Sequence, residues 1–269
     1  MKKGIAASKG YAIGTVFIQE HEEIIISDAK VSDIAAEKEK LSKALAQSKE
    51  QLEAIKEKTA NEIGEHEAQV FEAHLMLLDD VEFTGQMEMT IENDQLNAMK
   101  AVQNVTDTFV MIFDSMDDPY MRERAADIKD VSKRIIANLA GKGGNGMENV
   151  GANTVVVAHD LTPSDTAQLD RSKVIGFLTN IGGRTSHSAI MARTLEIPAV
   201  VGLGNITTSV KNGDTVIVDG IEGVAIINPD EATINEYKAR LEKFKAEQEE
   251  LKKLIDVKTT TKSGRRIEV

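Results

Sequence analysis

The residues best suited to chemistry lie in one short segment, Gly182–Ser188, whose sequence is GGRTSHS. A helix is predicted to follow over Ser188–Leu195, which places His187 at its start. The first N–H groups of a helix have no partner inside it, and the helix dipole favours negative charge there. Glycines let the backbone approach an anion, and an imidazole is a nucleophile near neutral pH. The segment therefore indicates a histidine that accepts a phosphoryl group or, on residue types alone, one that only caps the helix or lies at the surface.

The neighbours of this histidine suit phosphoryl transfer, which depends on in-line positioning and charge stabilisation. The glycines would let the backbone come close to the phosphoryl group, and the two hydroxyls would cap the helix or donate to phosphate. The arginine would pair with phosphoryl oxygens or with a nearby carboxylate. The residues concerned are Gly182, Gly183, Arg184, Thr185 and Ser186.

A longer stretch, 182–193, continued by Ile197–Gly202, resembles the phosphohistidine signature of the phosphoenolpyruvate-using enzymes. These include pyruvate phosphate dikinase, phosphoenolpyruvate synthase and Enzyme I of the bacterial sugar phosphotransferase system. The start of the chain, Lys3–Ser8 with Ala12–Gly14, resembles the Enzyme I amino terminus.

Two further segments, Phe71–Asp80 and Arg122–Ile128, resemble the helical region with which Enzyme I docks the phosphocarrier protein HPr. A dikinase or a synthase would not be expected to carry them. Three motifs in the right order along nearly the whole chain are far more specific than one.

The resemblance implies roles for individual residues. His187 would carry the phosphoryl group on its Nε2 atom, and the hydroxyl of Thr166 would be its partner. A docking surface for HPr would combine apolar side chains with acidic ones, although Val81 and Phe83 fall in a stretch that is usually more acidic. The docking residues would be Glu65, Glu67, His74, Met76, Leu77, Asp80, Glu82, Phe83 and Arg124.

Composition limits the classes of function. The 269 residues suit one large domain or two modest ones, and the absence of cysteine excludes disulfides and thiolate chemistry. A net charge of −12 without a basic stripe argues against nucleic-acid binding. No stretch approaches the roughly 18 apolar residues of a membrane span, and no apolar run follows Met1–Lys3 as in a secretory signal. We therefore expect a cytoplasmic protein, and the absence of His/Cys ligand spacing predicts no metal in this chain.

Periodicity changes twice along the chain. Residues 4–20 predict β structure, and helical patterns follow from Ser32–Asp33 to Gly141, with Asn61 marking a bend or a new helix. The Gly-rich run 141–146 reads as a linker, because it lacks the Lys-Ser/Thr of a phosphate loop. The predicted helices after a turn at Asp79–Asp80 are 82–95, 98–116 and 119–141, the last with Pro119 at its first position.

Strands alternate with short helices in the second half. Strands are predicted at Thr154–Ala158, Val174–Leu178, Ala199–Gly202, Thr215–Asp219 and Val224–Ile227. Residues 162–166 are predicted to cap a short helix at Ala167–Leu169, and a charged helix is predicted from Glu231 to about Ile255. A possible hairpin turn follows at Ser263–Gly264.

The predicted fold class is α/β. It consists of a swivelling phosphohistidine β/α domain with an inserted all-α helical-hairpin subdomain and a C-terminal linker helix. The α/β domain would be discontinuous, and the tail would begin the phosphoenolpyruvate-binding domain of the family. The predicted boundaries are 1–32 and 143–230 for the α/β domain, 33–142 for the helical HPr-docking subdomain, 231–256 for the linker helix and 257–269 for the tail.

The function expected from the resemblance is that of a phosphoenolpyruvate-protein phosphotransferase fragment, which exchanges phosphate reversibly between His187 and a histidine of HPr. Magnesium and phosphoenolpyruvate would be needed only with the C-terminal domain, and the fragment would be a monomer. Two alternatives stay open: the phosphohistidine domain of a dikinase or synthase relative, and a non-catalytic partner-binding module. The sequence leaves open the oligomeric state, the orientation of the two subdomains, the individual HPr contacts and the sugars served downstream.

Overall fold

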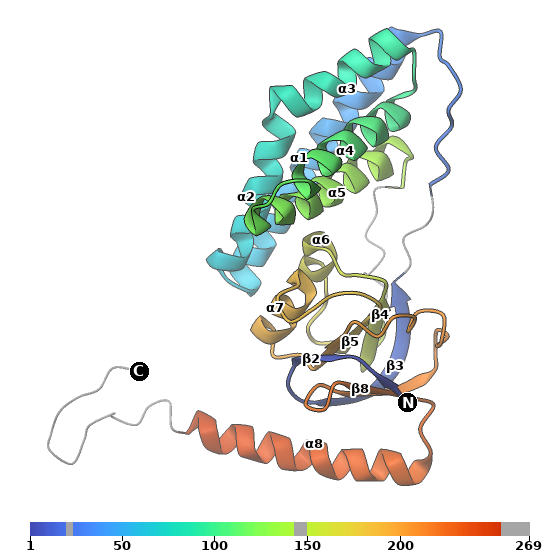
Figure 1. Ribbon diagram of the computed structural model, residues 1–269. Helices are drawn as coiled ribbons and strands as arrows, with labels where there is room; N and C mark the ends of the chain where they lie inside the picture. The colour runs from blue at the N-terminus through green and yellow to red at the C-terminus, as the bar shows by residue number, and fades with distance from the viewer. Residues whose placement is uncertain (20–23, 143–149, 254–269) are drawn as a thin grey trace, which may run out of the picture. The chain divides into compact units, whose positions relative to one another are not determined.

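The chain forms two compact units in the computed structural model, which describes residues 1–19, 24–142 and 150–253 (Figure 1). The α/β unit is made from Met1–Ile18, Gly151–His159 and the described chain from Ser172 onward. The helical unit is made from the described residues of Gln19–Val150 together with Asp160–Arg171. The predicted mixed α/β fold with an inserted set of helices is confirmed. The units divide differently from the predicted boundaries at 160–171, which group with the helices.

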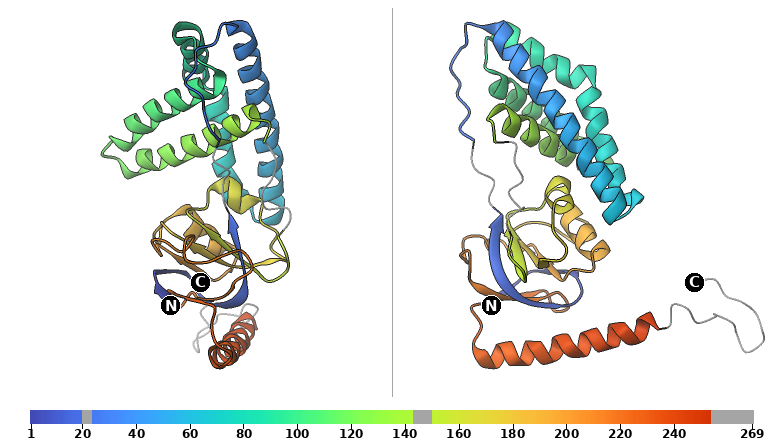
Figure 2. Two further views of the ribbon diagram at one scale, coloured as in Figure 1. Left: turned by 90° about the vertical axis from the view of Figure 1, so that its right-hand side faces the viewer. Right: turned by 180° about the vertical axis from the view of Figure 1, so that it is seen from behind.

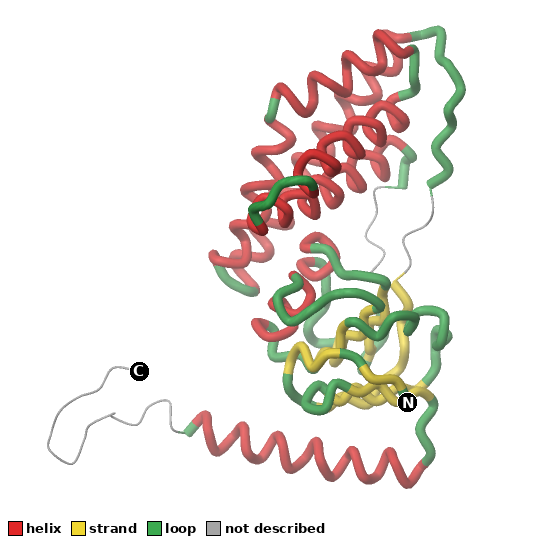
Figure 3. Tube along the Cα trace, in the orientation of Figure 1, coloured by secondary structure: helices red, strands yellow, loops and turns green. Residues whose placement is uncertain are grey.

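The α/β unit is built on one sheet, whose strands are yellow in Figure 3. The strand order is β1-β8-β7-β3-β4-β5-β6-β2. Strands β4, β5 and β6 pair in parallel, whereas β2–β6, β3–β7, β7–β8 and β1–β8 are antiparallel pairs. The strands are β1 (Lys2–Lys3), β2 (Ile5–Ser8), β3 (Tyr11–Gln19), β4 (Thr154–Ala158), β5 (Val174–Thr179), β6 (Ala199–Val201), β7 (Thr215–Asp219) and β8 (Val224–Ile227).

The central strands are buried on both faces. All five residues of β4 are buried, and its Val-rich sequence matches the continuous apolar run expected of a parallel strand covered on both sides. Val155, Val157 and Leu178 lie in one apolar core with residues of β3, β6 and β7. The sheet is thus a rigid base from whose strand ends the connecting loops start.

Two helices of the α/β unit were predicted closely. Helix α7 (His187–Thr194) connects β5 to β6, and α8 (Glu231–Lys252) follows β8. Tyr237 is the buried residue of α8, and the rest of that helix is half-buried or exposed, as its charged sequence predicts. Ile255 and the turn predicted at Ser263–Gly264 lie outside the described residues.

The described part of the helical unit contains five long helices and one short one. Figure 2 shows α1 running beside α2 and α5, and residues of α1 to α5 share one apolar core. Helix α1 runs through Asn61 and ends one residue later, so the break falls between Glu62 and Glu65 rather than at Asn61. The helices are α1 (Ile34–Glu62), α2 (Glu65–Asp79), α3 (Val81–Asp94), α4 (Ala98–Asp114), α5 (Pro119–Leu139) and α6 (Pro163–Ala167).

Side-chain caps explain where α1, α3 and α4 begin. Asp33 accepts a hydrogen bond from Ala36 N, Asp80 accepts from Glu82 N, and Asn97 accepts from Lys100 N. Each bond satisfies a first-turn N–H group that has no partner within the helix. Within the described residues, no helix is both long enough and apolar enough to cross a membrane.

Candidate functional site

His187 occupies the first position of α7, one residue earlier than predicted, and its side chain is half-buried. Ser186 is the N-cap residue: its Oγ accepts from Ala189 N at 3.4 Å and donates to the carbonyl of Gly183 at 2.8 Å. It also lies 3.1 Å from the hydroxyl of Ser188. Of the two hydroxyl residues predicted to cap the helix, Ser186 therefore does so. The imidazole lies at the positive end of the helix dipole.

The loop before α7 starts at the carboxyl end of a parallel strand, where α/β sheets place their ligand sites. The N–H groups of Leu203 and Gly204 donate to the carbonyls of Thr179 and Asn180 at 3.0 and 2.8 Å. The Asn180 side chain also bonds the N–H and the hydroxyl of Thr207, at 3.1 and 2.8 Å. These bonds join the loop after β5 to the loop after β6. Sequence reasoning missed Asn180, whose only signal was its place after a buried strand.

Gly182 and Gly183 suit their positions in the loop for different structural reasons. Gly182 has a φ of 113°, and a Cβ there would lie 3.1 Å from Ser186 Oγ. A side chain at Gly182 would thus be strained and would press on the capping hydroxyl. A Cβ at Gly183 would have nothing within 4 Å. The backbone at Gly183 therefore borders open space, as an anion-binding loop requires.

Arg193, in the last turn of α7, holds this loop from behind. Its Nη1 donates to the carbonyl of Arg184 at 2.9 Å and to the carbonyl of Ala7 at 3.1 Å. The side chain of Arg184 is exposed and forms no hydrogen bond or ion pair with the described residues. Of the two partners predicted for Arg184, a carboxylate within the described chain is therefore not observed. Arg193 is the last residue of the motif at 182–193, but the sequence pattern predicted no role for it.

Thr166 lies within α6 and not in the cap before it, which corrects the predicted helix at Ala167–Leu169. The actual cap is a reciprocal pair: Thr162 Oγ1 lies 3.2 Å from Asp165 N, and Asp165 Oδ2 accepts from Thr162 N at 3.0 Å. Thr166 is 1% exposed, and its hydroxyl donates to the carbonyls of Thr162 and Pro163 at 3.2 and 3.0 Å. His187 belongs to the α/β unit and Thr166 to the helical unit, so their approach stays a prediction.

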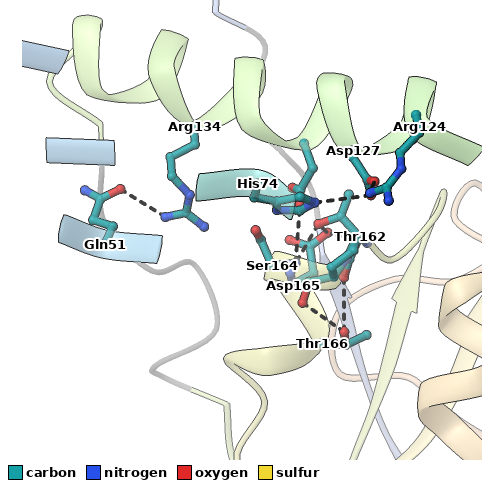
Figure 4. A network of polar contacts seen from close by, with 11 residues as sticks. Gln51, His74, Arg124, Asp127, Arg134, Thr162, Ser164, Asp165 and Thr166 are labelled. Carbon is teal, nitrogen blue, oxygen red and sulfur yellow. Dashed lines mark hydrogen bonds and ion pairs between the residues drawn. The ribbon is translucent and has the colours of Figure 1, made fainter. Parts of the chain in front are cut away.

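A network of polar side chains lies beside α6 in the helical unit (Figure 4). His74 is fully buried, with Nε2 at 3.2 Å from Asp127 Oδ1 and Nδ1 at 3.8 Å from Asp130 Oδ2. An ionised carboxylate can only accept a hydrogen bond, so in the contact with Asp127 the proton belongs to His74 Nε2. Arg124 Nη1 donates to Asp127 Oδ2 at 3.1 Å. The network thus links α2 and α5 through a buried histidine.

Two of the predicted docking residues are corrected by their burial. His74 and Phe83 are each 0% exposed, so neither side chain is available to a partner. Phe83 packs edge-on against Phe109 at a ring distance of 5.2 Å, and this apolar contact is the reason that a non-acidic residue stands there. The pattern placed both residues on the right helices but could not tell the buried face from the open one.

The other predicted docking residues remain accessible to different degrees. Met76 is 73% exposed, Leu77 is half-buried, and Arg124 is half-buried against Asp127. Val81, which the sequence noted, is 81% exposed. Met89, Met111 and Ile112 are among the exposed apolar side chains that the sequence did not single out. Glu65, Asp80 and Glu82 are exposed and Glu67 is half-buried.

Two family descriptions match the chain. Residues 3–124 match the N-terminal domain of PEP-utilising enzymes, and residues 150–223 match their mobile domain. An NMR solution structure of Enzyme I (nEIt) is 47% identical, with a TM-score of 0.77; the match covers 91% of this chain and 100% of that chain. The chain belongs to the Enzyme I family. The N-terminal domain of Enzyme 1 - Nitrogen, at 24% identity and a TM-score of 0.60 over 90% of this chain and 100% of that chain, shares the fold.

Curated members of the Enzyme I family extend the match over the whole chain. The phosphoenolpyruvate-protein phosphotransferase of Enterococcus faecalis is 48% identical over 100% of this chain and 47% of its own length. The Bacillus subtilis protein of the same name is 45% identical over 99% of this chain and 47% of its own length. The chain spans about half the length of the curated relatives it matches.

Magnesium and phosphoenolpyruvate were expected only together with the C-terminal phosphoenolpyruvate-binding domain of the family. Among the described residues, no three or more His, Asp or Glu side chains are grouped so that they could hold a metal ion.

Proposed function

We propose that His187 carries a phosphoryl group and exchanges it reversibly with the active histidine of HPr, as a cytoplasmic member of the sugar phosphotransferase system. The observation that carries the proposal is the position of His187, at the first residue of α7 behind the Gly182–Gly183 turn. The family supplies the context, because relatives of this chain are named phosphoenolpyruvate-protein phosphotransferases.

The reaction needs one nucleophilic nitrogen and one held nitrogen on the imidazole. The lone pair of Nε2 forms the bond to phosphorus as the bond to the donor nitrogen of HPr breaks. The donor nitrogen keeps the electron pair of the broken bond, so the transfer is reversible. The Nδ1–H must then be held by an acceptor. In our proposal this acceptor is the hydroxyl oxygen of Thr166, whose proton is directed to carbonyls of its own helix.

The developing charge on the phosphoryl oxygens needs positive partners placed in advance. The first-turn N–H groups of α7 and the open backbone at Gly183 would supply hydrogen bonds. Arg184 and Thr185 are both exposed beside the loop and would donate to the same oxygens. Arg193 would act indirectly, because it fixes the carbonyl of Arg184.

The proposed HPr surface lies on α2 and α3. Met76 and Leu77 would form its apolar part, and Asp80 and Glu82 its exposed acidic part. Acidic groups at an interface rim steer a basic partner and fix its orientation more than they add affinity. Because His74 and Phe83 are buried, we propose that they stabilise the helices that carry this surface and do not contact HPr themselves.

The test is intact mass after mixing the chain with phosphorylated HPr, alongside a His187→Ala variant. We expect one acid-labile phosphoryl group on the wild type and none on the variant. A His159→Ala variant is the matched control, because His159 is an exposed histidine of the same unit. Folded wild-type chain that takes no phosphoryl group from an active donor would refute the proposal. Phosphoryl transfer from a nucleotide-bound site, and not from HPr, would favour the dikinase or synthase alternative. Binding of HPr without formation of phosphohistidine would favour the non-catalytic binding module.

A further inference from the structure

Helix α6 is too short to be stable by itself. It has five residues, whereas isolated helices of fewer than about 12 residues are marginal in water even with favourable sequences. Yet it carries Thr166, which is 1% exposed. The position of the Thr166 hydroxyl therefore depends on what holds α6 to the rest of the helical unit.

One part of the attachment is apolar. Ala167, the last residue of α6, lies in the apolar core formed by α1 to α5 and is 4% exposed. All five residues of α6 are buried, so packing restrains the helix as a whole. Apolar packing is not directional, and hydrogen bonds add direction to this attachment.

The directional contact comes from Asp130 on α5. Its Oδ2 accepts a hydrogen bond from Ser164 N at 3.2 Å, and the side chain of Asp130 is 5% exposed. Ser164 is the second residue of α6, so this N–H group has no acceptor within its own helix. A carboxylate at this position also interacts favourably with the helix dipole. Within α6, the N–H group of Asp165 donates to the capping residue Thr162. The bond from Ser164 N to Asp130, by contrast, links α6 to a different helix.

Two other polar side chains lie beside Asp130. His74 Nδ1 on α2 lies 3.8 Å from Asp130 Oδ2. Arg134, one turn further along α5, interacts electrostatically with Asp130 and Asp165. Burial lowers the pKa of Arg134, and the two carboxylates oppose that shift. Figure 4 shows His74 and Arg134 on the side of α5 that faces α6. The carboxylate thus lies beside a buried imidazole and accepts its hydrogen bond from the start of α6.

We propose that Asp130 is a positioning residue for the phosphoryl-transfer step, because its carboxylate holds the start of α6 and so the place of the Thr166 hydroxyl. The proposal rests on the proposed function of His187 and Thr166, and assigns to the helical unit a second role besides docking. Asp130 touches neither phosphate nor the reacting imidazole; it acts through α6 alone.

The kinetic test is a double-mutant cycle on the rate of phosphoryl transfer from phosphorylated HPr in a single turnover. Asp130→Ala is expected to slow transfer by about tenfold, as the loss of one charge-assisted hydrogen bond would. In a Thr166→Val background the same change is expected to slow transfer no further, since the hydroxyl it positions is gone. Asp130→Asn keeps an acceptor oxygen and is expected to recover most of the rate.

The matched control is Glu37 on α1. Its carboxylate is also buried and also accepts from a first-turn N–H group of another helix, that of Ala98 at 2.8 Å. No residue of the proposed reaction lies on α4. Glu37→Ala removes this acceptor as Asp130→Ala removes the other, and it is therefore expected to lower stability without slowing transfer. This outcome separates a positioning effect from loss of structure.

A second measurement does not depend on catalysis. Amide hydrogen exchange at Ser164, Asp165 and Thr166 is expected to rise in Asp130→Ala while exchange in the middle of α1 stays unchanged. Equal slowing in both backgrounds, or no change in amide exchange at α6, would overturn the role of Asp130. A wild-type chain that takes no phosphoryl group would overturn the proposed function and this inference together, whereas normal transfer in Asp130→Ala would overturn the inference alone.

Discussion

The hydroxyl of Tyr237 donates to Oδ2 of Asp219 at 3.0 Å, with Tyr237 8% exposed and Asp219 fully buried. Tyr237 lies on α8 and Asp219 ends β7, so this bond attaches the last helix to the sheet. The Tyr237 ring packs edge-on against Tyr11, and the guanidinium of Arg240 lies 4.7 Å from its centre. The start of α8 therefore has one buried anchor while the rest of the helix is half-buried or exposed.

Removal of that hydroxyl should loosen α8. Tyr237→Phe leaves the ring in place and takes one hydrogen bond from a buried carboxylate, which typically costs about 2 kcal/mol. We expect a lower free energy of unfolding in urea at pH 7 and faster amide exchange at the start of α8. Arg240→Gln is the control, because Arg240 is 42% exposed and its contact with Asp219 is 3.8 Å long. Equal effects of the two changes would contradict the role given to the hydroxyl.

The same bond predicts a change of stability in the alkaline range. Burial and then the hydrogen bond to Asp219 raise the pKa of Tyr237 to about 12, above its ordinary value of 10.0. The protonated phenol is therefore favoured in the folded state. Its contribution is complete below pH 10 and is lost as the pH rises through about 12. The difference in unfolding free energy between wild type and Tyr237→Phe should shrink over this pH range. A difference that grows with pH would contradict the raised pKa of Tyr237.

Much of this architecture could be predicted where local chemistry decides it. Asp33 and Pro119 stand where the sequence predicts helix starts, because caps and a first-position proline act within one turn. The run Thr154–Ala158 was recognisable as a buried strand from its β-branched residues. The phosphohistidine motif placed His187 at a helix start to within one residue.

What could not be predicted depends on contacts between distant segments. Nothing local shows that Asp130 accepts from Ser164 N, which is 34 residues away. The burial of His74 and Phe83 follows from which helices pack on which face, whereas a helical period only shows that they share a side with other residues. The two-residue strand β1 exists because β8 pairs with it, and two residues carry no pattern.

The two glycines of the loop should respond differently to alanine. Gly182→Ala places a Cβ at a φ of 113° and 3.1 Å from Ser186 Oγ, so we expect a loss of about 1–3 kcal/mol in stability. Gly183→Ala meets nothing within 4 Å and should leave stability unchanged within about 0.5 kcal/mol. If the backbone at Gly183 faces the phosphoryl group, this second variant should still slow transfer. Thermal unfolding and single-turnover transfer, measured on both variants, separate the two effects.

Ser186→Ala should weaken the start of α7. The change removes the cap to Ala189 N and the bond to the Gly183 carbonyl, and loss of an N-cap typically costs about 1 kcal/mol. Because the cap also orients the first turn that carries His187, we expect slower phosphoryl transfer. Ser186→Thr keeps a hydroxyl and is the conservative comparison. Ser209→Ala is the distant control, since its hydroxyl donates to the Asn205 carbonyl at an exposed position. Transfer slowed equally by Ser186→Thr and Ser186→Ala would show that the hydroxyl is not what matters.

The proposed HPr surface predicts unequal effects of two exposed methionines. Met76, at 73% exposure near the end of α2, lies inside the proposed surface, whereas Met89, at 54% exposure on α3, lies outside it. Met76→Ala should weaken HPr binding by about 1–2 kcal/mol, because a few central apolar side chains dominate most interfaces. Met89→Ala should leave the dissociation constant unchanged, and neither change should alter stability much, since both side chains are largely in water. Isothermal titration with unphosphorylated HPr measures both. Equal losses of affinity, or none for Met76→Ala, would move the docking surface away from the end of α2.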